Sequence, residues 1–330
     1  ASVTMMTALA LPTMLKQGYK HTLATGVICA SGTLGILIPP SIMLIIMADL
    51  LSISVGDLFL AALMPGLVLA TLYVLYIGVA SGINKELAPP LPPDALYVPP
   101  NEMPSLLLRS FFPPVFLIAL IKGSILLGWA TPSEAGAVGA FGATVIAYFN
   151  GRLKRDMVTA VCQSSGLTIS FIFFIIMSAT CFAYVFRSLG GDDVIEELIL
   201  HAGLDSWGLL FLIMGIVFLL GFFLDWVEIT LIILPVFAPI VATLDFGAHV
   251  GNENREMIYW FTVLIAINLQ TSFLTPPFGY ALFYLKGIAP RSVALASIYR
   301  GIIPFVILQL IALVLVIWLP AVALWLPGLN

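Results

Sequence analysis

The stretches ASGTLGILIPPS (Ala30–Ser41) and LQTSFLTPPFG (Leu269–Gly279) share a pattern that is unusual inside apolar sequence. In each, a tip of glycine, proline and hydroxyl residues separates two short apolar arms. Irregular backbone at membrane depth is tolerated only where protein or a water-filled cavity surrounds it. We therefore predict two re-entrant helical hairpins, the first over residues 22–48 and the second over residues 257–286.

The composition places the whole chain in a membrane. Of the 330 residues, 61% are hydrophobic and 9% are charged, and the mean hydropathy is +1.12. Soluble domains are about half apolar and about a quarter charged. The excess lies in runs such as Leu209–Leu224, Phe171–Phe186 and Ile302–Leu319, which match or approach the length that crosses a ~30 Å hydrocarbon core. We expect an all-α polytopic membrane protein, with residues 1–330 forming a single membrane-embedded unit.

Polar segments mark the connections between the apolar runs. Residues 83–104 are rich in proline and are expected to be a connection between two membrane segments. The basic loop Asn150–Asp156 is placed in the cytoplasm by the positive-inside rule. The acidic segment Gly190–Ser206 is predicted to be a helix that lies along the membrane surface.

Several functional classes lack their sequence signatures. The cysteines Cys29, Cys162 and Cys181 lie in apolar segments, and their spacing fits neither a disulfide framework nor a metal site. No HExxH, GxSxG or GxxxxGK[ST] motif occurs, which argues against a membrane enzyme and against an ATP-driven pump. We predict that the protein is not an enzyme, needs no organic cofactor and binds no nucleic acid.

The two interrupted stretches belong to a weak internal repeat. Pro39-Pro40 corresponds to Pro276-Pro277, and upstream of these pairs TALALP (Thr7–Pro12) corresponds to TLIILP (Thr230–Pro235). A single proline pair would favour a structural kink, but two pairs in matching context, flanked by hydroxyl and glycine residues, favour a role of the tips in transport. We expect the two halves to be inverted structural repeats. Broken hydrophobic segments at corresponding positions of two repeats indicate the binding site of a secondary transporter.

The chemistry of such tips suits a small cation and an anion. Half-helix ends expose backbone carbonyls, and serine and threonine hydroxyls add further oxygens, which are the ligands that Na⁺ prefers. Helix N-termini present free N–H groups and a positive dipole end, which suit an anionic substrate. On this ground we expect the substrate near Pro39, Pro40, Ser41, Thr275, Pro276 and Pro277.

Two further carboxylates lie in apolar surroundings. Thr131–Glu134 and Asp225–Glu228 each place a capping residue three positions before a glutamate, which is the pattern of a capping box. The alternative is that these residues bind ions or substrate, since ionisable residues within membrane segments are candidates for function. Asp225 has the stronger case, because the repeat pairs it with Ser2.

Three long segments resemble one family. They are SGTLGILIPPSIMLIIMADLLSISVGDLFLAALMPG (Ser31–Gly66), ATPSEAGAVGAFGA (Ala130–Ala143) and TPPFGYALFYLKGIAP (Thr275–Pro290). They look like segments of the large membrane subunit of TRAP (tripartite ATP-independent periplasmic) transporters. The motifs ATPSEAG (Ala130–Gly136) and LDWVEI (Leu224–Ile229) most resemble the branch of the family labelled mannitol/chloroaromatic. The family's subunit extends further at its N-terminus, so we expect this chain to be truncated there.

The resemblance implies a Na⁺-driven elevator in the bacterial inner membrane. It implies a periplasmic binding protein that delivers a small organic acid, and a small four-helix membrane subunit, within the lipid bilayer. Carried over by position, the ion site would be lined by Ser31, Gly32, Thr33, Gln270, Thr271 and Ser272. Asp225 joins this set because the internal repeat pairs it with Ser2. The same carry-over places Thr131, Ser133 and Glu134 at the substrate.

Two other functions remain open at this point. A one-component carboxylate symporter or antiporter could use the same hairpins without a binding protein. A channel would not need two inverted hairpins, and its flux would not respond to a Na⁺ gradient.

Overall fold

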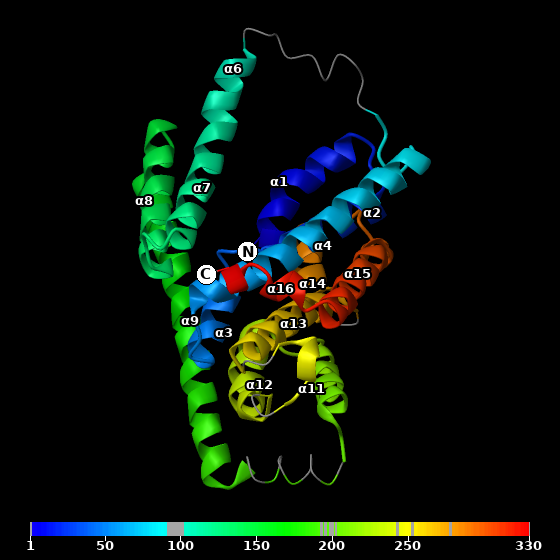
Figure 1. The fold of residues 1–330 in the computed structure, drawn as a ribbon. Coiled ribbons are helices and arrows are strands. Elements are labelled where there is room, and N and C mark those ends of the chain that lie inside the picture. Colours follow the sequence, from blue (N-terminus) through cyan, green and yellow to red (C-terminus); the bar gives the residue numbers. More distant parts are fainter. Residues whose placement is uncertain are drawn as a thin grey trace. The chain divides into compact units, whose positions relative to one another are not determined.

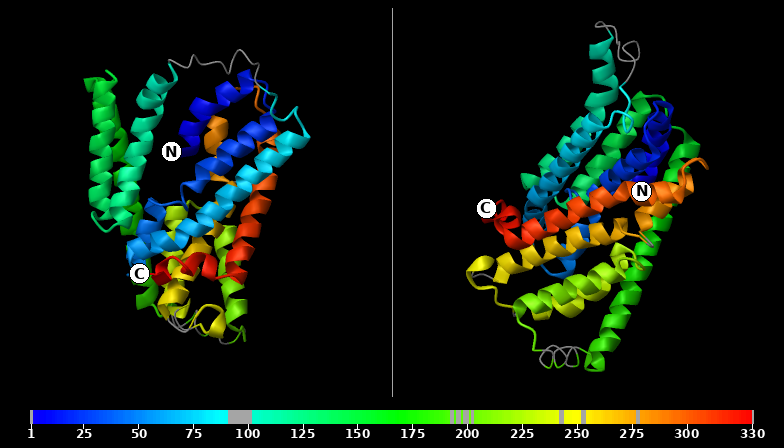
Figure 2. Two further views of the ribbon diagram at one scale, coloured as in Figure 1. Left: turned by 45° about the horizontal axis from the view of Figure 1, so that its top comes forward. Right: turned by 90° about the vertical axis from the view of Figure 1, so that its right-hand side faces the viewer.

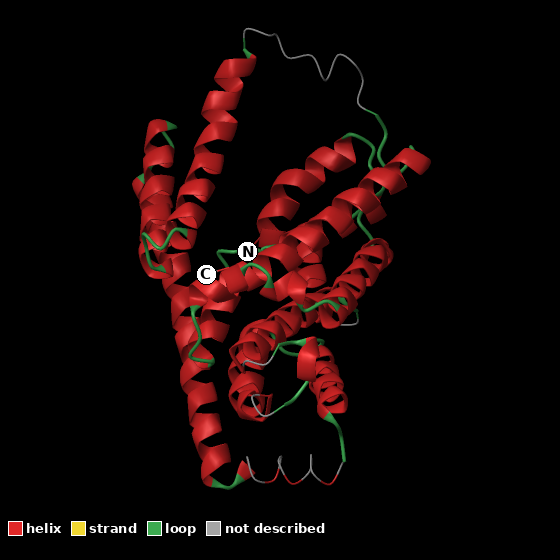
Figure 3. Cartoon of the chain, viewed as in Figure 1, coloured by secondary structure: helices red, strands yellow, loops and turns green. Residues whose placement is uncertain are grey.

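The computed structural model describes residues 2–90, 102–191, 194, 197, 201, 203–241, 244–251, 254–276 and 279–329. Within these residues every regular element is a helix (Figure 3). The chain divides into two compact units, the first formed by Ala1–Pro90 with Ser178–Asn330 and the second by Leu91–Met177. The predicted all-α fold is therefore confirmed for the described residues.

The N-terminal part of unit 1 contains four helices (Figure 1). They are α1 (Ser2–Lys16), α2 (His21–Leu34), α3 (Ile42–Leu50) and α4 (Val55–Ile83). α2 packs against α1 and α15, whereas α3 packs against α4 and α12. The two arms of the first interrupted stretch thus have different neighbours.

The C-terminal part of unit 1 repeats this order of a helix, an interrupted stretch and a long helix. Its elements are α11 (Ser206–Leu220), α12 (Trp226–Val241), η2 (Gly247–His249), α13 (Asn254–Leu274), α14 (Tyr280–Ile288), α15 (Leu295–Trp318), α16 (Ala321–Leu324) and η3 (Pro327–Leu329). α14 packs against α1 and α2, just as α3 packs against α12 and α13. Figure 2 shows α13 running beside α15 in a view turned from that of Figure 1.

Unit 2 contains a helical pair and most of a long helix. Its elements are α6 (Met103–Leu106), the π-helical turn η1 (Leu107–Phe111), α7 (Phe112–Leu126) and α8 (Pro132–Phe149), and α9 (Arg155–Ser188) runs from this unit into unit 1. α7 packs against α8. The sharp turn between them begins at Gly128, whose φ of 70° favours glycine because it lacks a Cβ.

Four of the described helices are long and apolar enough to cross a membrane, namely α4, α9, α13 from Arg255 onward, and α15. This fits a polytopic membrane protein. α13 is the core helix, since 94% of its most apolar window is buried, against 6% for α9. α13 contacts α2, α3, α4, α11, α12, α14, α15 and α16, so most other helices of unit 1 are arranged around it.

Most expected segment boundaries agree with the helices to within a few residues. The proline-rich connection 83–104 begins at the last residue of α4 and ends after the first two residues of α6. Its residues 91–101 lie outside the described part, and so does much of the predicted surface helix Gly190–Ser206. The hairpin interpretation of residues 22–48 and 257–286 stays a prediction. The helices confirm only that each stretch is two helices separated by a break.

Candidate functional site

The first break runs from Gly35 to Ser41, between α2 and α3. The amides of Ile36 and Leu37 donate to the carbonyls of Thr33 and Leu34, so α2 ends in a tight turn. At the far side, the Ser41 hydroxyl donates to the Ile36 carbonyl and accepts from the amide of Leu44, which makes Ser41 the N-cap of α3. The sequence thus predicted correctly where the helix stops and restarts.

The start of α1 lies against this break. A methyl group placed on Gly32 would lie 2.5 Å from Val3 Cγ2 and 2.9 Å from Val3 Cα, so only glycine fits at this contact. A methyl group on Gly35 would lie 3.9 Å from Ser2 Oγ. Of the predicted tip residues, Thr33 is buried and donates to the Ala30 carbonyl at 3.0 Å. The remaining residues are half-buried Ser31, buried Pro39 and exposed Pro40.

The second break begins after Leu274 and ends at Gly279, before α14. Thr271, Ser272 and Thr275 donate their hydroxyl hydrogens to carbonyls of α13, at 2.8, 2.9 and 2.7 Å. A hydroxyl that donates in this way keeps its oxygen lone pairs free for a cation. Pro276 is half-buried, while the predicted residue Pro277 lies outside the described residues.

The turn between α11 and α12, Gly221–Asp225, contacts both sides of the second break. A methyl group on Gly221 would lie 2.0 Å from Ser272 Oγ, so the turn lies directly on α13. On the other side, the Tyr280 hydroxyl at the start of α14 donates to the Phe223 carbonyl at 2.9 Å. The structure therefore brings the predicted residues Asp225 and Ser272 into one region.

Asp225 lies at the start of α12. Of the two hydrogen bonds of the predicted capping box, the structure shows the one from the Asp225 amide to the Glu228 side chain. The Asp225 amide donates to Glu228 Oε2 at 3.0 Å, and Asp225 Oδ1 accepts from the next amide, Trp226, at 2.8 Å. The carboxylate thus caps its own helix, and its free oxygen lone pairs remain available in a half-buried position. Both interpretations from the sequence, a cap and an ion ligand, are compatible with this geometry.

The two breaks approach each other through α2 and α14. Cys29 Sγ, one turn before Gly32, lies 3.8 Å from the carbonyl oxygen of Ala281. Ala281 follows the second break by two residues. Both interrupted stretches therefore contribute to one region of unit 1.

Gln270 is the most unusual polar residue of this region. It is fully buried, and neither its amide nitrogen nor its amide oxygen has a hydrogen-bond partner. A helix turns about 100° per residue, so Gln270 lies about 200° round α13 from Ser272 and faces away from the α11–α12 turn. A buried amide without partners is destabilising by about 1–3 kcal/mol, which favours the view that a ligand supplies them.

The predicted substrate residues Thr131, Ser133 and Glu134 belong to unit 2. The Thr131 amide donates to Glu134 Oε2 at 2.7 Å, and the Glu134 amide donates to Thr131 Oγ1 at 3.3 Å. This is the complete capping box that the sequence predicts at the start of α8. The residues lie at an exposed helix start, and their role at the substrate stays a prediction.

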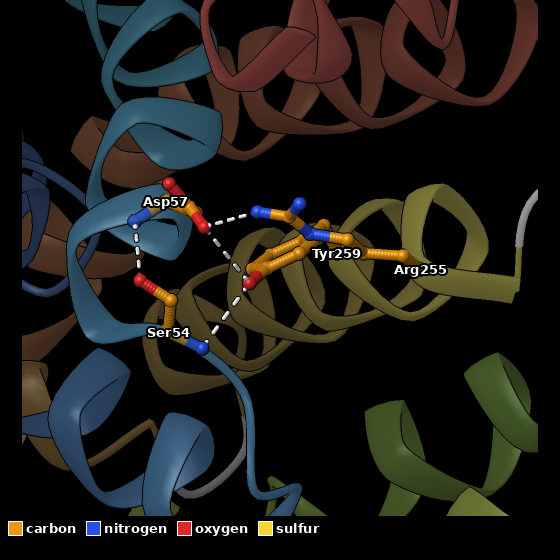
Figure 4. Close-up of polar contacts among 4 residues, drawn as sticks. All are labelled: Ser54, Asp57, Arg255 and Tyr259. Atoms are coloured by element: carbon orange, nitrogen blue, oxygen red, sulfur yellow. Dashed lines mark hydrogen bonds and ion pairs between the residues drawn. The ribbon is translucent and has the colours of Figure 1, made fainter. Parts of the chain in front are cut away.

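A polar cluster that the sequence did not indicate joins α4 to α13 (Figure 4). Asp57 accepts hydrogen bonds from Arg255 and from the Tyr259 hydroxyl, the latter at 3.4 Å. The Tyr259 hydroxyl also accepts from the amide of Ser54, at 3.1 Å, and Ser54 caps α4 at Asp57. The cluster connects the end of one interrupted stretch to the beginning of the other.

Asn268 is a buried polar residue that the sequence also did not indicate. Its side-chain amide donates to the Met214 carbonyl at 2.7 Å and so attaches α13 to α11. Only its position within an apolar segment, two residues before Gln270, could have indicated it. Asn268 thereby fixes the arm that carries the Gly221–Asp225 turn against the second break.

Residues 1–322 match the family described as "Tripartite ATP-independent periplasmic transporter, DctM component". The chain belongs to the DctM family. Members of this family are transporters, so the predictions of family and of a non-enzymatic function are confirmed. The two interrupted segments, α2–α3 and α13–α14, are therefore part of a transport protein.

Several relatives of this DctM-family chain are similar over almost its full length. The C4-dicarboxylate TRAP transporter large permease protein DctM of Pseudomonas aeruginosa is 30% identical, over 99% of this chain and 73% of the relative. The 2,3-diketo-L-gulonate TRAP transporter large permease protein YiaN of Escherichia coli is 29% identical, over 97% and 71%. The ectoine TRAP transporter large permease protein TeaC of Halomonas elongata is 27% identical, over 96% and 70%. The mannitol/chloroaromatic branch stays a prediction.

Proposed function

We propose that this chain is the permease of a Na⁺-driven TRAP system that imports a small organic acid across the bacterial inner membrane. The observation that carries the proposal is the contact between the two breaks through Cys29 and Ala281, together with the Gly221–Asp225 turn that lies against both sides of the second break. The printed names of the relatives, a C4-dicarboxylate and a diketogulonate permease among them, support an organic acid as the substrate class.

Na⁺ binds at the second break in this proposal. Its ligands come from the hydroxyl oxygens of Thr271 and Ser272 and from free carbonyls of the break, with Asp225 supplying negative charge. The amide of Gln270 lies on the opposite side of α13 and binds a separate ligand. Ser31, Gly32 and Thr33 form the corresponding site at the first break. Hard cations prefer such oxygen ligands, and the carbonyl end of α13 carries a negative dipole end.

The organic acid binds beside the ions. The N-termini of α3 and α14 begin at Ser41 and at Tyr280, after Pro39-Pro40 and after the second break. Each offers amides without an intrahelical partner, which favour a carboxylate. Ion binding orders the breaks first, so that the substrate finds a formed site.

An elevator movement of part of unit 1 transfers the loaded site across the membrane. The matching contacts of α3 with α12 and of α14 with α1 support two repeats of the same structure. α11 and α12, at 15 and 16 residues, are about 22–24 Å long and are joined by the Gly221–Asp225 turn. They are shorter than a ~30 Å bilayer core and pack against each other, as the arms of a re-entrant hairpin would.

The test is uptake into liposomes. The full-length permease is reconstituted with its small four-helix membrane subunit, its periplasmic binding protein is added outside, and labelled organic acids are offered with and without an inward Na⁺ gradient. We expect uptake only when the gradient and the binding protein are both present. Uptake without the binding protein would instead show a one-component symporter, and flux that ignores the gradient would contradict Na⁺ coupling.

A further inference from the structure

Unit 2 contains a cavity that the transport site does not use. Its volume is about 630 Å³, and it lies where the segment from η1 into α7 faces the C-terminal end of α8. Its lining consists of Leu108, Pro113, Ile146, Phe149 and Asn150. Leu108, Pro113, Ile146 and Phe149 contribute apolar side chains and the rest of the lining is polar, so the cavity suits an amphipathic ligand with its polar group at the Asn150 end.

The backbone at the end of α8 brings a cation to this end of the cavity. The Gly151 amide donates to the Tyr148 carbonyl, and the Arg152 amide donates to the Ala147 carbonyl, both at 2.9 Å. With a φ of 65° at Gly151, these two bonds form a Schellman motif. The motif folds Arg152 back over the last turn of α8, beside Asn150. Arg152 lies only two residues, at most about 7 Å of chain, from a residue that lines the cavity.

Two more cations follow Arg152. Lys154 directly precedes α9 and Arg155 is its first residue, and both are exposed, as Arg152 is. Within the described residues no ion pair involves any of the three side chains. The three positive charges are therefore available to a ligand at the mouth of this cavity.

We propose that this cavity is a binding site for an anionic phospholipid. One acyl chain lies between Leu108, Pro113 and Ile146, and the phosphate meets Arg152, Lys154 and Arg155. Basic groups next to pockets between membrane helices on the cytoplasmic side bind anionic head groups, and each cation near the surface contributes about 1 kcal/mol, or about fivefold in affinity. The positive-inside rule places this loop on that side.

The charge pattern selects a lipid of this class. A zwitterionic head group would carry its own cation toward Arg152, Lys154 and Arg155, and would lose most of the electrostatic attraction. A free phosphate would gain the charges but leave the apolar lining in contact with water. Exposed aromatic side chains at this helix end, Tyr148 and Phe149, are also typical of the interface between lipid chains and head groups. The site does not depend on Na⁺ coupling.

The experiment is a lipid titration of the full-length permease in non-ionic detergent, followed by native mass spectrometry. Phosphatidylglycerol and phosphatidylcholine with identical acyl chains are compared as the two probes. We expect tighter binding of phosphatidylglycerol, and we expect the variant R152Q/K154Q/R155Q to lose up to roughly 100-fold of that affinity. The variant should keep the affinity for phosphatidylcholine, since the apolar lining is unchanged.

Two further variants separate the site from general effects. K16Q/K85Q/R300Q removes three exposed cations of unit 1 and should leave the preference intact. Ile146→Trp fills the cavity and should weaken the binding of both lipids while the thermal unfolding temperature stays near that of the parent protein.

Three outcomes would overturn the proposal. The parent protein could bind both lipids equally, or the K16Q/K85Q/R300Q control could lose the preference as fully as R152Q/K154Q/R155Q does. Undiminished phosphatidylglycerol binding by Ile146→Trp would show that the head group is held outside the cavity. Should Ile146→Trp fail to fold, Ile146→Asn provides the same test by making the lining polar.

Discussion

The two interrupted segments of unit 1, α2–α3 and α13–α14, meet their neighbours through different groups. α2 contacts α15 through glycines, since a methyl group on Gly26 would lie 2.2 Å from the Gly301 carbonyl oxygen. α13 instead uses side chains, with Asn268 bonded to α11 and Arg255 and Tyr259 bonded to Asp57. Contacts between backbones leave no room for adjustment, whereas side chains can rotate. The comparison indicates a fixed first segment and an adjustable second one.

The strongest test of the fixed segment is Gly26→Val. The added Cβ would meet the Gly301 backbone, which cannot move without displacing α15, so we expect a loss of unfolding free energy at the upper end of about 1–3 kcal/mol. Thermal unfolding in lipid nanodiscs measures the effect. Gly78→Val on α4 is the control, because nothing lies within 4 Å of its Cβ position. Equal losses in both variants would show that the close contact does not matter.

A smaller loss is expected at the adjustable segment from Gly221→Ala. The new methyl group would lie 2.0 Å from Ser272 Oγ, a side-chain atom that can turn away, so stability should fall toward the lower end of about 1–3 kcal/mol. Na⁺-driven uptake should fall more steeply, because Ser272 would lose its position at the break. The double variant Gly221→Ala/Ser272→Gly should recover stability but not uptake. Recovery of both would remove Ser272 from the ion site.

Gln270→Leu should change stability and transport in opposite directions. Replacing a buried amide that has no partner by an apolar side chain of similar size should raise the unfolding free energy by about 1–3 kcal/mol. The same variant should lose the Na⁺ dependence of uptake if the separate ligand of this amide is Na⁺. Measurements of thermal unfolding and of uptake against Na⁺ concentration belong together. A variant that is more stable and transports normally would show that Gln270 has no ligand.

A modest effect is expected from opening the polar cluster. In Asp57→Asn the ion pair to Arg255 is lost while the hydrogen bond to Tyr259 can persist, and Arg255 is 60% exposed, so solvent already weakens the pair. We expect the thermal unfolding temperature to fall by less than it does in Gly221→Ala, and the decrease should become smaller at high salt. Arg255→Gln should lower the unfolding temperature by a similar amount. The double variant Asp57→Asn/Arg255→Gln should be little less stable than either single variant. Additive losses would mean that the two residues act separately.

The smallest effect is expected where α2 has an exposed ion pair of its own. Lys20 Nζ lies 2.8 Å from Glu86 Oε2, and this hydrogen bond together with the lysine charge holds the pKa of Glu86 below its usual range. Because the folded-state pKa is the lower one, the stabilisation is present above the ordinary glutamate pKa of about 4.3 and is lost as the pH falls through the folded value. Glu86→Gln should therefore be slightly less stable near neutral pH only. Thermal unfolding of the parent protein and of Glu86→Gln from a pH of about 7 to about 3 tests this prediction. If the difference between their unfolding temperatures increases on acidification, the ion pair does not stabilise the protein.

The parts that the sequence predicted are those with a local signature. Pro39-Pro40 and the glycines before them interrupt a helix through their own backbone restrictions, and Thr131 with Glu134 forms a cap within four residues. The turn Gly221–Asp225 was harder to assign, because it lies between apolar runs without a proline and marks only a helix start. Its contact with Ser272 depends on how α11 packs, which no local pattern contains.

Long-range pairs could not be predicted for a related reason. Gly26 meets Gly301, and Asp57 meets Arg255, across most of the chain. Glycine is common in membrane helices, and charged residues are common at their ends, so neither indicates its partner. In a membrane, apolar periodicity is also a weak guide, since lipid and protein interior are equally apolar. The partners become visible only when the helices are assembled.

The burial of α13 has a consequence for how the chain is made. Its Asn268, Gln270, Thr271 and Ser272, in the last two turns of the helix, would face lipid if the helix entered the bilayer alone, and polar side chains within a membrane segment oppose insertion. At the ribosome, α2, α4 and α11 are synthesised before α13, while α15, which also covers it, follows. We expect α13 to leave the translocon only once α15 has emerged. With Cys29, Cys162 and Cys181 replaced by alanine and a single cysteine introduced as Ala266→Cys on α13, nascent chains that stop before Leu295 should leave that thiol accessible to a water-soluble reagent, whereas chains that continue past Trp318 should protect it.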